Sequence, residues 1–158
     1  MEQIDVAKEQ ALHFLTFRPR SSTEVRQYLQ RKDHPLSIQE EVVEWLQHLG
    51  YVDDLRFAMQ WIENRYRTNP MGVRRLSKEL WQKGIPQPII NEALERCGAT
   101  VDEGALAKEL ATKQARRYRG QDSTVIARRL AGFLGRRGFR SDDIQRAISE
   151  TLEALHLP

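Results

Sequence analysis

Arginine is the side chain whose number and spacing in this sequence could do chemistry. Between positions 113 and 140 there are nine basic residues and one acidic residue, Asp122, so the stretch carries a net charge of +8. A solvated protein surface normally mixes charges of both signs. Because guanidinium groups form bidentate contacts with phosphates and carboxylates, this bias favours a polyanionic partner. Phosphate contacts of this kind position a protein on a nucleic-acid backbone without reading the base sequence.

Two tyrosines lie among arginines. Tyr118 belongs to the run 116–119, and Tyr66 is flanked by Arg65 and Arg67. An aromatic ring between guanidinium groups could stack on an exposed base while the guanidiniums hold the neighbouring phosphates. Packing of each tyrosine at the end of a helix explains the same pattern equally well, so both interpretations stay open.

The residue types needed for catalysis or metal binding are present but not grouped. Four histidines are scattered between positions 13 and 156, and they show no ligand spacing with one another or with Cys97. A phosphate-binding loop and a dinucleotide fingerprint are both missing from the sequence. Asp53 and Asp54 could form an acidic pair, but a helix N-cap followed by a first-turn carboxylate is the favoured interpretation. We therefore predict no catalytic, cofactor or metal site, and a protein that is not an enzyme.

Charge is distributed unevenly along the 158 residues. Residues 1–54 have a net charge of −4, residues 55–100 of +4 and residues 101–158 of +3, as expected of a protein that meets a polyanion with part of its surface. A single cysteine excludes an internal disulfide and fits a reducing compartment. No basic and apolar leader follows Met1, and no apolar run approaches the ~20 residues that span a bilayer. We expect a cytoplasmic monomer without a membrane partner.

Helices are the elements that must position these side chains. Apolar residues recur at helical spacing along the whole chain, and strand signals are almost absent. Gly50 fits the left-handed end of one helix. Three capping boxes, Ser21 with Glu24, Ser37 with Glu40 and Thr100 with Glu103, predict the starts of three others.

An internal repeat divides the chain. Positions 74–94 align without a gap on positions 128–148, at an offset of 54 residues, and positions 25–32 align on 76–83 at an offset of 51. Such a period is typical of helical repeats. The sequence thus predicts an all-α protein of three tandem three-helix modules, residues 1–50, 51–98 and 99–158, forming an elongated curved rod. The first module is acidic and the others basic. The predicted core includes Trp61, Leu76, Leu80, Ile90 and Leu130.

The central stretch resembles the RecX family, the regulators of the RecA recombinase filament. The residues that carry the resemblance are Gly50-Tyr51-Val52-Asp53-Asp54 with Phe57-Ala58, then Gly72, Leu76, Glu79-Leu80 and Lys83-Gly84-Ile85. The flanks match more loosely, through Arg20-Ser21 with Glu24-Val25 and Leu29 before this stretch and Arg137-Gly138-Phe139 with Ile144 after it. The resemblance covers nearly the whole chain. Its specificity lies in the order and spacing of these residues, because no single motif is unique.

This resemblance implies a non-enzymatic regulator, mainly an inhibitor, that binds in the groove of the RecA–single-stranded DNA filament. It would modulate recombination, DNA repair and the SOS response, and it could bind duplex DNA weakly. The residues expected to face the filament and its DNA are Arg65, Arg67, Arg74, Arg75, Lys83, Arg116, Arg117, Arg119, Arg128, Arg129, Arg136 and Arg137. Two departures from the repeat are Asp33, which replaces a glycine, and the acidic first module. The alternatives are a direct DNA-binding module similar to helix-turn-helix proteins and a helical-repeat scaffold for another protein.

Overall fold

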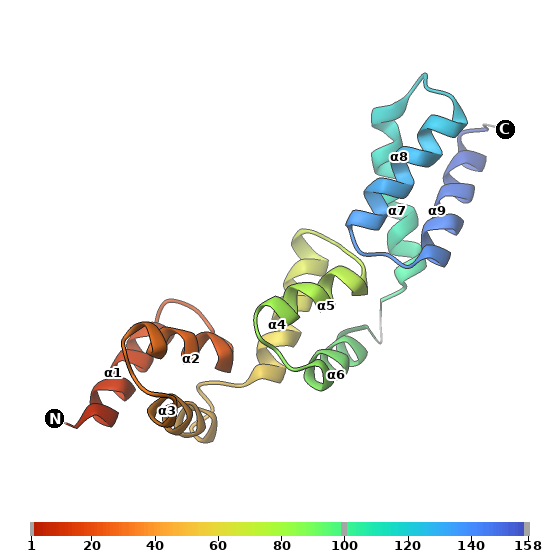
Figure 1. Ribbon diagram of the computed structural model, residues 1–158. Helices are drawn as coiled ribbons and strands as arrows, with labels where there is room; N and C mark the ends of the chain where they lie inside the picture. The colour runs from red at the N-terminus through yellow and green to blue at the C-terminus, as the bar shows by residue number, and fades with distance from the viewer. Residues whose placement is uncertain (1, 99–100, 157–158) are drawn as a thin grey trace. The chain divides into compact units, whose positions relative to one another are not determined.

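The computed structural model describes residues 2–98 and 101–156, and within them every regular element is helical (Figure 1). This confirms the predicted all-α helical-repeat fold. The elements are α1 (Gln3–Leu15), α2 (Ser22–Arg31), α3 (Leu36–His48), α4 (Asp54–Thr68), α5 (Val73–Gln82), α6 (Gln87–Gly98), α7 (Glu103–Ala115), the short 3₁₀ helix η1 (Arg116–Tyr118), α8 (Ser123–Arg136) and α9 (Ser141–Ala154).

One of the three predicted capping boxes is confirmed, and the box predicted at Thr100 lies outside the residues that the structure describes. Ser21 Oγ accepts a hydrogen bond from the backbone N–H of Glu24 at 3.1 Å, and the Glu24 carboxylate accepts one from the Ser21 N–H at 3.3 Å. The box predicted at Ser37 is wrong. Helix α3 begins two residues earlier, with Pro35 as its N-cap, because the Pro35 carbonyl already accepts the N–H groups of the first turn, so Ser37 lies inside the helix.

The chain divides into two compact units, residues 1–61 with 79–93 and residues 62–78 with 94–158. In the first unit, helices α1, α2 and α3 enclose an aliphatic core, and the Phe14 and Tyr28 rings stack beside it with their centroids 4.2 Å apart. The buried residues of this core are Ala7, Ala11, Val25, Leu29, Val42, Val43, Leu46 and Val52.

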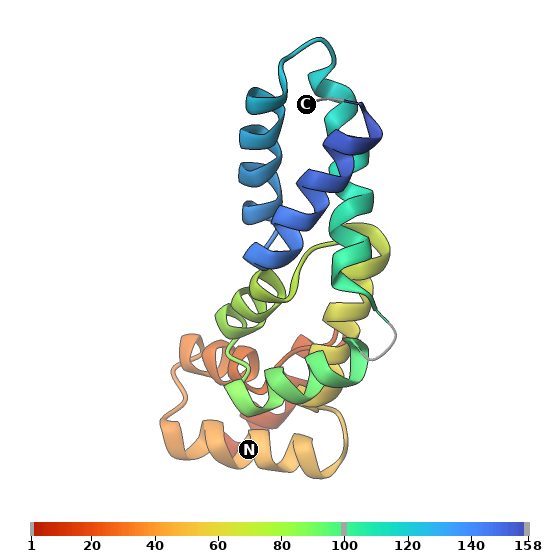
Figure 2. The same cartoon turned by 90° about the vertical axis from the view of Figure 1, so that its right-hand side faces the viewer.

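In the second unit, helices α7, α8 and α9 lie side by side (Figure 2). Small residues on α7 let α9 approach closely, because Ala107, Ala111 and Ala115 all face the core. Four of the predicted core residues are confirmed, since Leu76, Leu80, Ile90 and Leu130 are fully buried. Trp61 is only half-buried, and its indole N–H donates to Glu79 Oε1 at 3.0 Å.

Each unit contains one contact in which a carboxylate covers the start of a helix from the preceding module. In the first unit, the buried Asp54 at the start of α4 accepts hydrogen bonds from the Ser22 N–H at 2.8 Å and the Ser22 hydroxyl at 2.6 Å. In the second unit, Glu103 at the start of α7 accepts one from the Val73 N–H at 2.9 Å. The first N–H groups of α2 and α5 have no partner within their own helices, so these carboxylates satisfy them from outside. We call this arrangement, together with the turn described next, the module joint.

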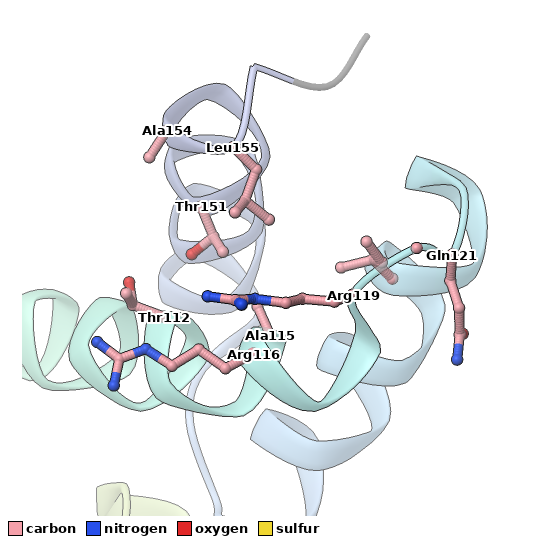
Figure 3. A pocket seen from close by; sticks show the side chains of 10 residues that line it. Thr112, Ala115, Arg116, Arg119, Gln121, Thr151, Ala154 and Leu155 are labelled. Atoms are coloured by element: carbon pink, nitrogen blue, oxygen red, sulfur yellow. The ribbon is translucent and has the colours of Figure 1, made fainter.

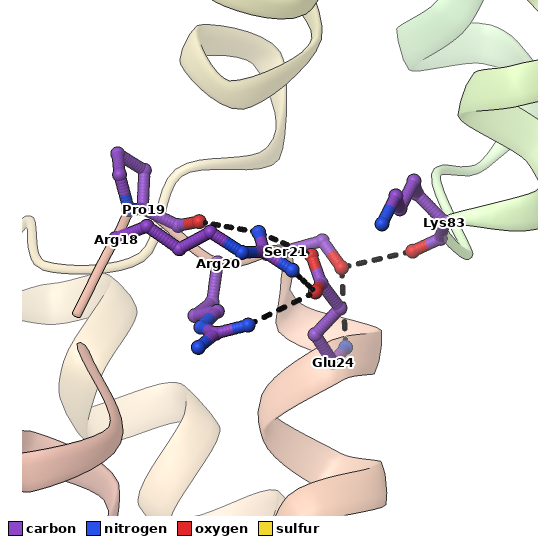
Figure 4. Close-up of polar contacts among 6 residues, drawn as sticks. All are labelled: Arg18, Pro19, Arg20, Ser21, Glu24 and Lys83. Atoms are coloured by element: carbon purple, nitrogen blue, oxygen red, sulfur yellow. Dashed lines mark hydrogen bonds and ion pairs between the residues drawn. The ribbon is translucent and has the colours of Figure 1, made fainter.

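A turn completes the module joint of the first unit. The Ser21 hydroxyl donates to the Lys83 carbonyl at 2.9 Å (Figure 4). The Thr23 hydroxyl donates to the Gly84 carbonyl at 2.9 Å. Both carbonyls belong to the turn that follows α5, where they lack partners within the helix. Hydroxyl groups at the start of α2 therefore supply the donors that the free carbonyls after α5 lack.

The second unit has the same contact to a turn, but its donors are backbone N–H groups instead of side-chain hydroxyls. The Gly72 N–H donates to the Arg137 carbonyl at 2.7 Å, and the Arg74 N–H donates to the Gly138 carbonyl at 3.1 Å. At the repeat offsets, Gly72 corresponds to Ser21, and Arg137 to Lys83. The two joints therefore have the same design in different residues.

Glycine is required at both joint turns. Gly84 and Gly138 have φ of +81° and +85°, and a Cβ would lie 2.3 Å from the Thr23 side chain in one joint and 2.3 Å from the Arg75 backbone nitrogen in the other. Asp33, at the same position of the first module, has φ of +65° but is exposed. The residue that is not glycine therefore occurs in the turn that no neighbouring module covers.

Replacing Leu76 by alanine should lower the free energy of unfolding by roughly 2–5 kcal/mol, because the side chain is fully buried. Urea denaturation would measure the loss, with Lys78→Ala on the exposed side of the same helix as the control. A loss no greater than that of the control would mean that Leu76 does not contribute to the core.

Replacing Gly138 by alanine should destabilise the protein more than replacing Gly120 by alanine. Both residues have positive φ, which costs roughly 1–2 kcal/mol for an alanine, but a Cβ at Gly120 meets nothing within 4 Å. Crowding against Arg75 should add about 1–3 kcal/mol at Gly138. Equal shifts of the thermal midpoints would contradict the close contact in the joint.

Candidate filament and nucleic-acid interface

The densest basic cluster is carried by the turn between α7 and α8. Helix α7 gives way to η1, and Gly120, with φ of +83°, reverses the chain before Asp122 caps α8. Arg116, Arg117 and Arg119 are all exposed on this turn. The sequence folds in this way because a 3₁₀ turn, a glycine and an N-cap follow one another within seven residues.

Helix α8 extends this basic surface. Arg128 and Arg129 are exposed, and the Arg129 guanidinium lies 5.4 Å from the centroid of the Tyr118 ring. The Tyr118 hydroxyl accepts a hydrogen bond from Gln114 Nε2 at 3.0 Å. Tyr118 packs against the core of the third module and is half-buried, so the structure favours its packing at a helix end over free stacking on a base.

Tyr66 also packs within the protein. Burial, together with the nearby Glu103 and Cys97, raises its pKa to about 12. Burial and the Glu63 carboxylate raise the pKa of the Cys97 thiol as well, which keeps it protonated. Both residues are half-buried.

Arg137 is held inside the second unit. Its Nη1 donates to Asn69 Oδ1 at 2.8 Å and to the Pro70 carbonyl at 3.0 Å, and its guanidinium lies 5.1 Å from the centroid of the Phe133 ring. Burial lowers its pKa, as does the nearby Arg75. Arg137 therefore ties the loop before α5 to the end of α8, and its planar group has little freedom to contact a partner.

The predicted site residues are not all brought together. Eleven of the twelve belong to the second unit, and Lys83 belongs to the first, where its Nζ lies 5.3 Å from the Trp61 ring. Arg65, Arg75, Lys83 and Arg137 are half-buried. The exposed members are Arg67, Arg74, Arg116, Arg117, Arg119, Arg128, Arg129 and Arg136.

The module joints are structural features that reasoning from the sequence missed. Asp53 does cap α4, because its Oδ1 accepts the Arg56 N–H at 3.0 Å, but Asp54 binds a helix of the preceding module instead of its own. A signal was available, since Asp54 and Glu103 are each the first helical residue of their module.

Neither a metal site nor a membrane span is evident in the part of the chain that the structure describes. Across residues 2–98 and 101–156, no three His, Cys, Asp or Glu side chains are grouped as metal ligands would be. None of the helices in those ranges combines the length and apolar character that crossing a bilayer demands.

Comparison with known proteins gives a consistent result. Three family descriptions match in succession: the first three-helix domain of RecX at residues 7–46, the second at residues 53–94 and the third at residues 102–148. The chain is 30% identical over 152 residues to the regulatory protein RecX of Streptomyces coelicolor, covering 96% of this chain and 80% of that one. It is 32% identical over 145 residues to that of Bacillus pumilus, covering 92% and 55%.

Two solved structures share the fold. The crystal structure of RecX from Lactobacillus salivarius matches with a TM-score of 0.83 at 24% identity, covering 94% of this chain and 96% of that one. A crystal structure of regulatory protein RecX matches with a TM-score of 0.79 at 26% identity, covering 90% and 70%.

Replacing Arg137 by glutamine should lower the free energy of unfolding by roughly 1.5–3 kcal/mol, because two hydrogen bonds from a charged group are lost. The neighbouring exposed Arg136→Gln should change it by less than about 0.5 kcal/mol. Urea unfolding of the two variants makes the comparison. Similar values would show that the internal bonds of Arg137 add no stability.

Proposed function

The chain belongs to the RecX family of regulatory proteins, and from this membership we propose that it regulates the RecA recombinase, mainly as an inhibitor. It binds in the groove of the RecA–single-stranded DNA filament in the cytoplasm, as a monomer, and thereby modulates recombination, DNA repair and the SOS response. The observation that carries the proposal is the exposed arginine surface on the turn between α7 and α8 and on α8 itself.

The charge of this surface suits a nucleoprotein partner. Residues 113–140 carry a net charge of +8, and Arg116, Arg117, Arg128 and Arg129 are exposed within them. Guanidinium groups bind phosphates in a bidentate manner without reading the base sequence. A surface of this kind supports binding to the filament regardless of the DNA sequence that it holds.

Repetition of modules gives the binding its strength. A chain with several similar modules can contact more than one RecA protomer, and each additional contact is then intramolecular, so weak contacts combine through effective concentration. A chain lying in the groove hinders entry of a second DNA strand or of a repressor substrate. It shifts the filament between active and inactive forms only by the difference in its affinity for them.

No chemical step is assigned to this chain. The family is one of regulatory proteins, and the proposal needs only binding. Any change in ATP hydrolysis that accompanies binding is a change in the RecA protomers, because the regulator supplies contacts and RecA supplies the nucleotide site.

One titration series tests the proposal. Binding is measured to bare single-stranded DNA, bare duplex DNA, RecA alone and the assembled filament, each at several salt concentrations. We expect the tightest binding to the filament, with affinity that falls as salt rises, by a slope near −0.7 per phosphate contact on a single strand. Tightest binding to bare duplex would instead support a direct DNA-binding module, and salt-independent binding without DNA would support a scaffold.

Reversing two charges on α8 should weaken the inhibition. The double variant Arg128→Glu with Arg129→Glu removes two exposed guanidiniums and should reduce inhibition of RecA strand exchange severalfold, with little change in the thermal midpoint. The matched control reverses two exposed charges of the acidic first module, Arg31→Glu with Lys32→Glu. Inhibition that is lost equally in both double variants would argue against a specific role for α8.

A further inference from the structure

The third module has an open pocket beside the basic turn. Its volume is about 520 Å³, within the range of ligand-binding clefts, and it lies among the end of α7, the turn at Gly120, the start of α8 and the last turn of α9 (Figure 3). Ala115, Ile126 and Leu155 provide apolar walls, and Arg116 and Arg119 provide positive charge. Among the described residues, no carboxylate lines this pocket, and the side chains of Arg116 and Arg119 have no ion-pair partner.

A buried hydroxyl in this pocket lacks a partner. Thr151, on α9, is 2% exposed, and its Oγ1 makes no hydrogen bond in the described part of the chain. Figure 3 shows this side chain facing that of Arg119. Because buried polar side chains are nearly always hydrogen-bonded, the free hydroxyl points to a polar group that is supplied from outside.

The internal repeat shows what occupies the corresponding place in the middle module. At the offset of 54 residues, Thr151 corresponds to Cys97 and Ile126 to Gly72. The middle module is covered there by the start of α7, where the half-buried Glu103 binds the N–H next to Gly72. In the first unit, Asp54 covers the start of α2 in the same way. The first turn of an acidic helix is therefore the occupant in both cases that the structure displays.

Two residues of the middle module are replaced in the third module, and both replacements favour an acidic occupant. With the starts of α4 and α7 aligned, Glu63 of the middle module corresponds to Thr112, and Tyr66 corresponds to Ala115. A carboxylate is thus replaced by a hydroxyl, and a large ring by a methyl group. The pocket is consequently wider and more positive than the surface that receives Glu103.

A second copy of this chain is a poor match for the pocket. The first helical residue of its first module is Gln3 instead of a carboxylic acid, and the turn after α2 has Asp33 where the two joints require glycine. The Cβ of Asp33 would enter the space that Thr23 and Arg75 fill opposite Gly84 and Gly138. Head-to-tail association would therefore lack both the carboxylate and the close turn.

We propose that this pocket binds the first turn of an acidic helix of a protein partner. A carboxylate of that turn lies between the guanidiniums of Arg116 and Arg119 and accepts a hydrogen bond from the Thr151 hydroxyl, while an adjacent apolar side chain covers the exposed Leu155. The inference rests on the proposed function in that it assigns these two arginines of the candidate interface to protein recognition instead of DNA.

The probe for the test is an acetylated, fluorescently labelled peptide with the sequence of residues 101–115, the segment that covers the middle module. We expect saturable binding to the full-length chain with one peptide per molecule by fluorescence anisotropy. The double variant Arg116→Gln with Arg119→Gln should weaken binding at least tenfold. A matched control, Lys113→Gln with Arg117→Gln, removes the same charge from neighbouring positions that do not line the pocket and should change it less than threefold.

Two further variants separate specific recognition from charge alone. A peptide in which Asp102 and Glu103 are replaced by Asn and Gln should bind at least tenfold more weakly. Thr151→Val should weaken binding of the acidic peptide severalfold without lowering the thermal midpoint, because it removes a hydroxyl that has no hydrogen-bond partner within residues 2–98 and 101–156. Peptide binding unchanged by Thr151→Val or by Arg116→Gln with Arg119→Gln would overturn the inference.

Parallel measurements test the other occupants. If the Arg116→Gln, Arg119→Gln variant loses affinity for an oligo-dT strand but not for the peptide, the pocket is a nucleic-acid site and the inference fails. If it abolishes a concentration-dependent dimer seen by sedimentation, the occupant is a second copy and the inference also fails. Absence of peptide binding by a chain that still inhibits RecA filaments would overturn this inference alone and leave the proposed function standing.

Discussion

The structure depends on which acceptors bind the free N–H groups of a helix's first turn when that turn is buried. The opening N–H groups of α2 and α5 have no acceptor within their own helices, and each helix starts against another part of the protein instead of in water. Asp54 and Glu103 supply the missing acceptor from the next module, where their negative charge also suits the positive end of the helix dipole. A single acidic side chain thereby connects two modules that are each too small for a large core of their own.

The joints also decide which basic residues remain available to a partner. Arg137 is used to hold the loop before α5, and the backbone carbonyls of Lys83 and Arg137 accept hydrogen bonds within the joints. The arginines of the α7–α8 turn and the outer side of α8 are not needed for either purpose, and they are exposed. A regulator that acts by contact alone requires such a division, because a side chain that holds the fold together cannot be given up to a partner without loss of stability.

The sequence predicted the helices, the repeat and most of the core, because these follow from local periodicity. The burial of Leu76, Leu80, Ile90 and Leu130 is an example. It did not predict that Asp54 pairs with Ser22, 32 positions away, since an acidic residue at a helix start is explained equally well by its own helix. Nor could the charge pattern show that Arg137 is bonded inside the protein while Arg136 is exposed. The two are neighbours of the same type, and only the folded backbone decides where each side chain points. The role of each basic residue toward DNA or RecA stays a prediction.

The differences between modules follow from which of their surfaces are covered. Glycine stands at the turns of Gly84 and Gly138, where a Cβ would collide with the neighbouring module, whereas the uncovered turn of the first module has Asp33. Likewise, Tyr66 lies near Glu103 and Cys97, whereas Ala115 and Thr151, which correspond to Tyr66 and Cys97, line an open pocket. Substitution at a repeated position thus marks a change of neighbour. The first two modules each receive a carboxylate from the module that follows, Asp54 in one case and Glu103 in the other. The arginines beside the pocket of the third module are, by the same argument, placed to receive a carboxylate from a partner.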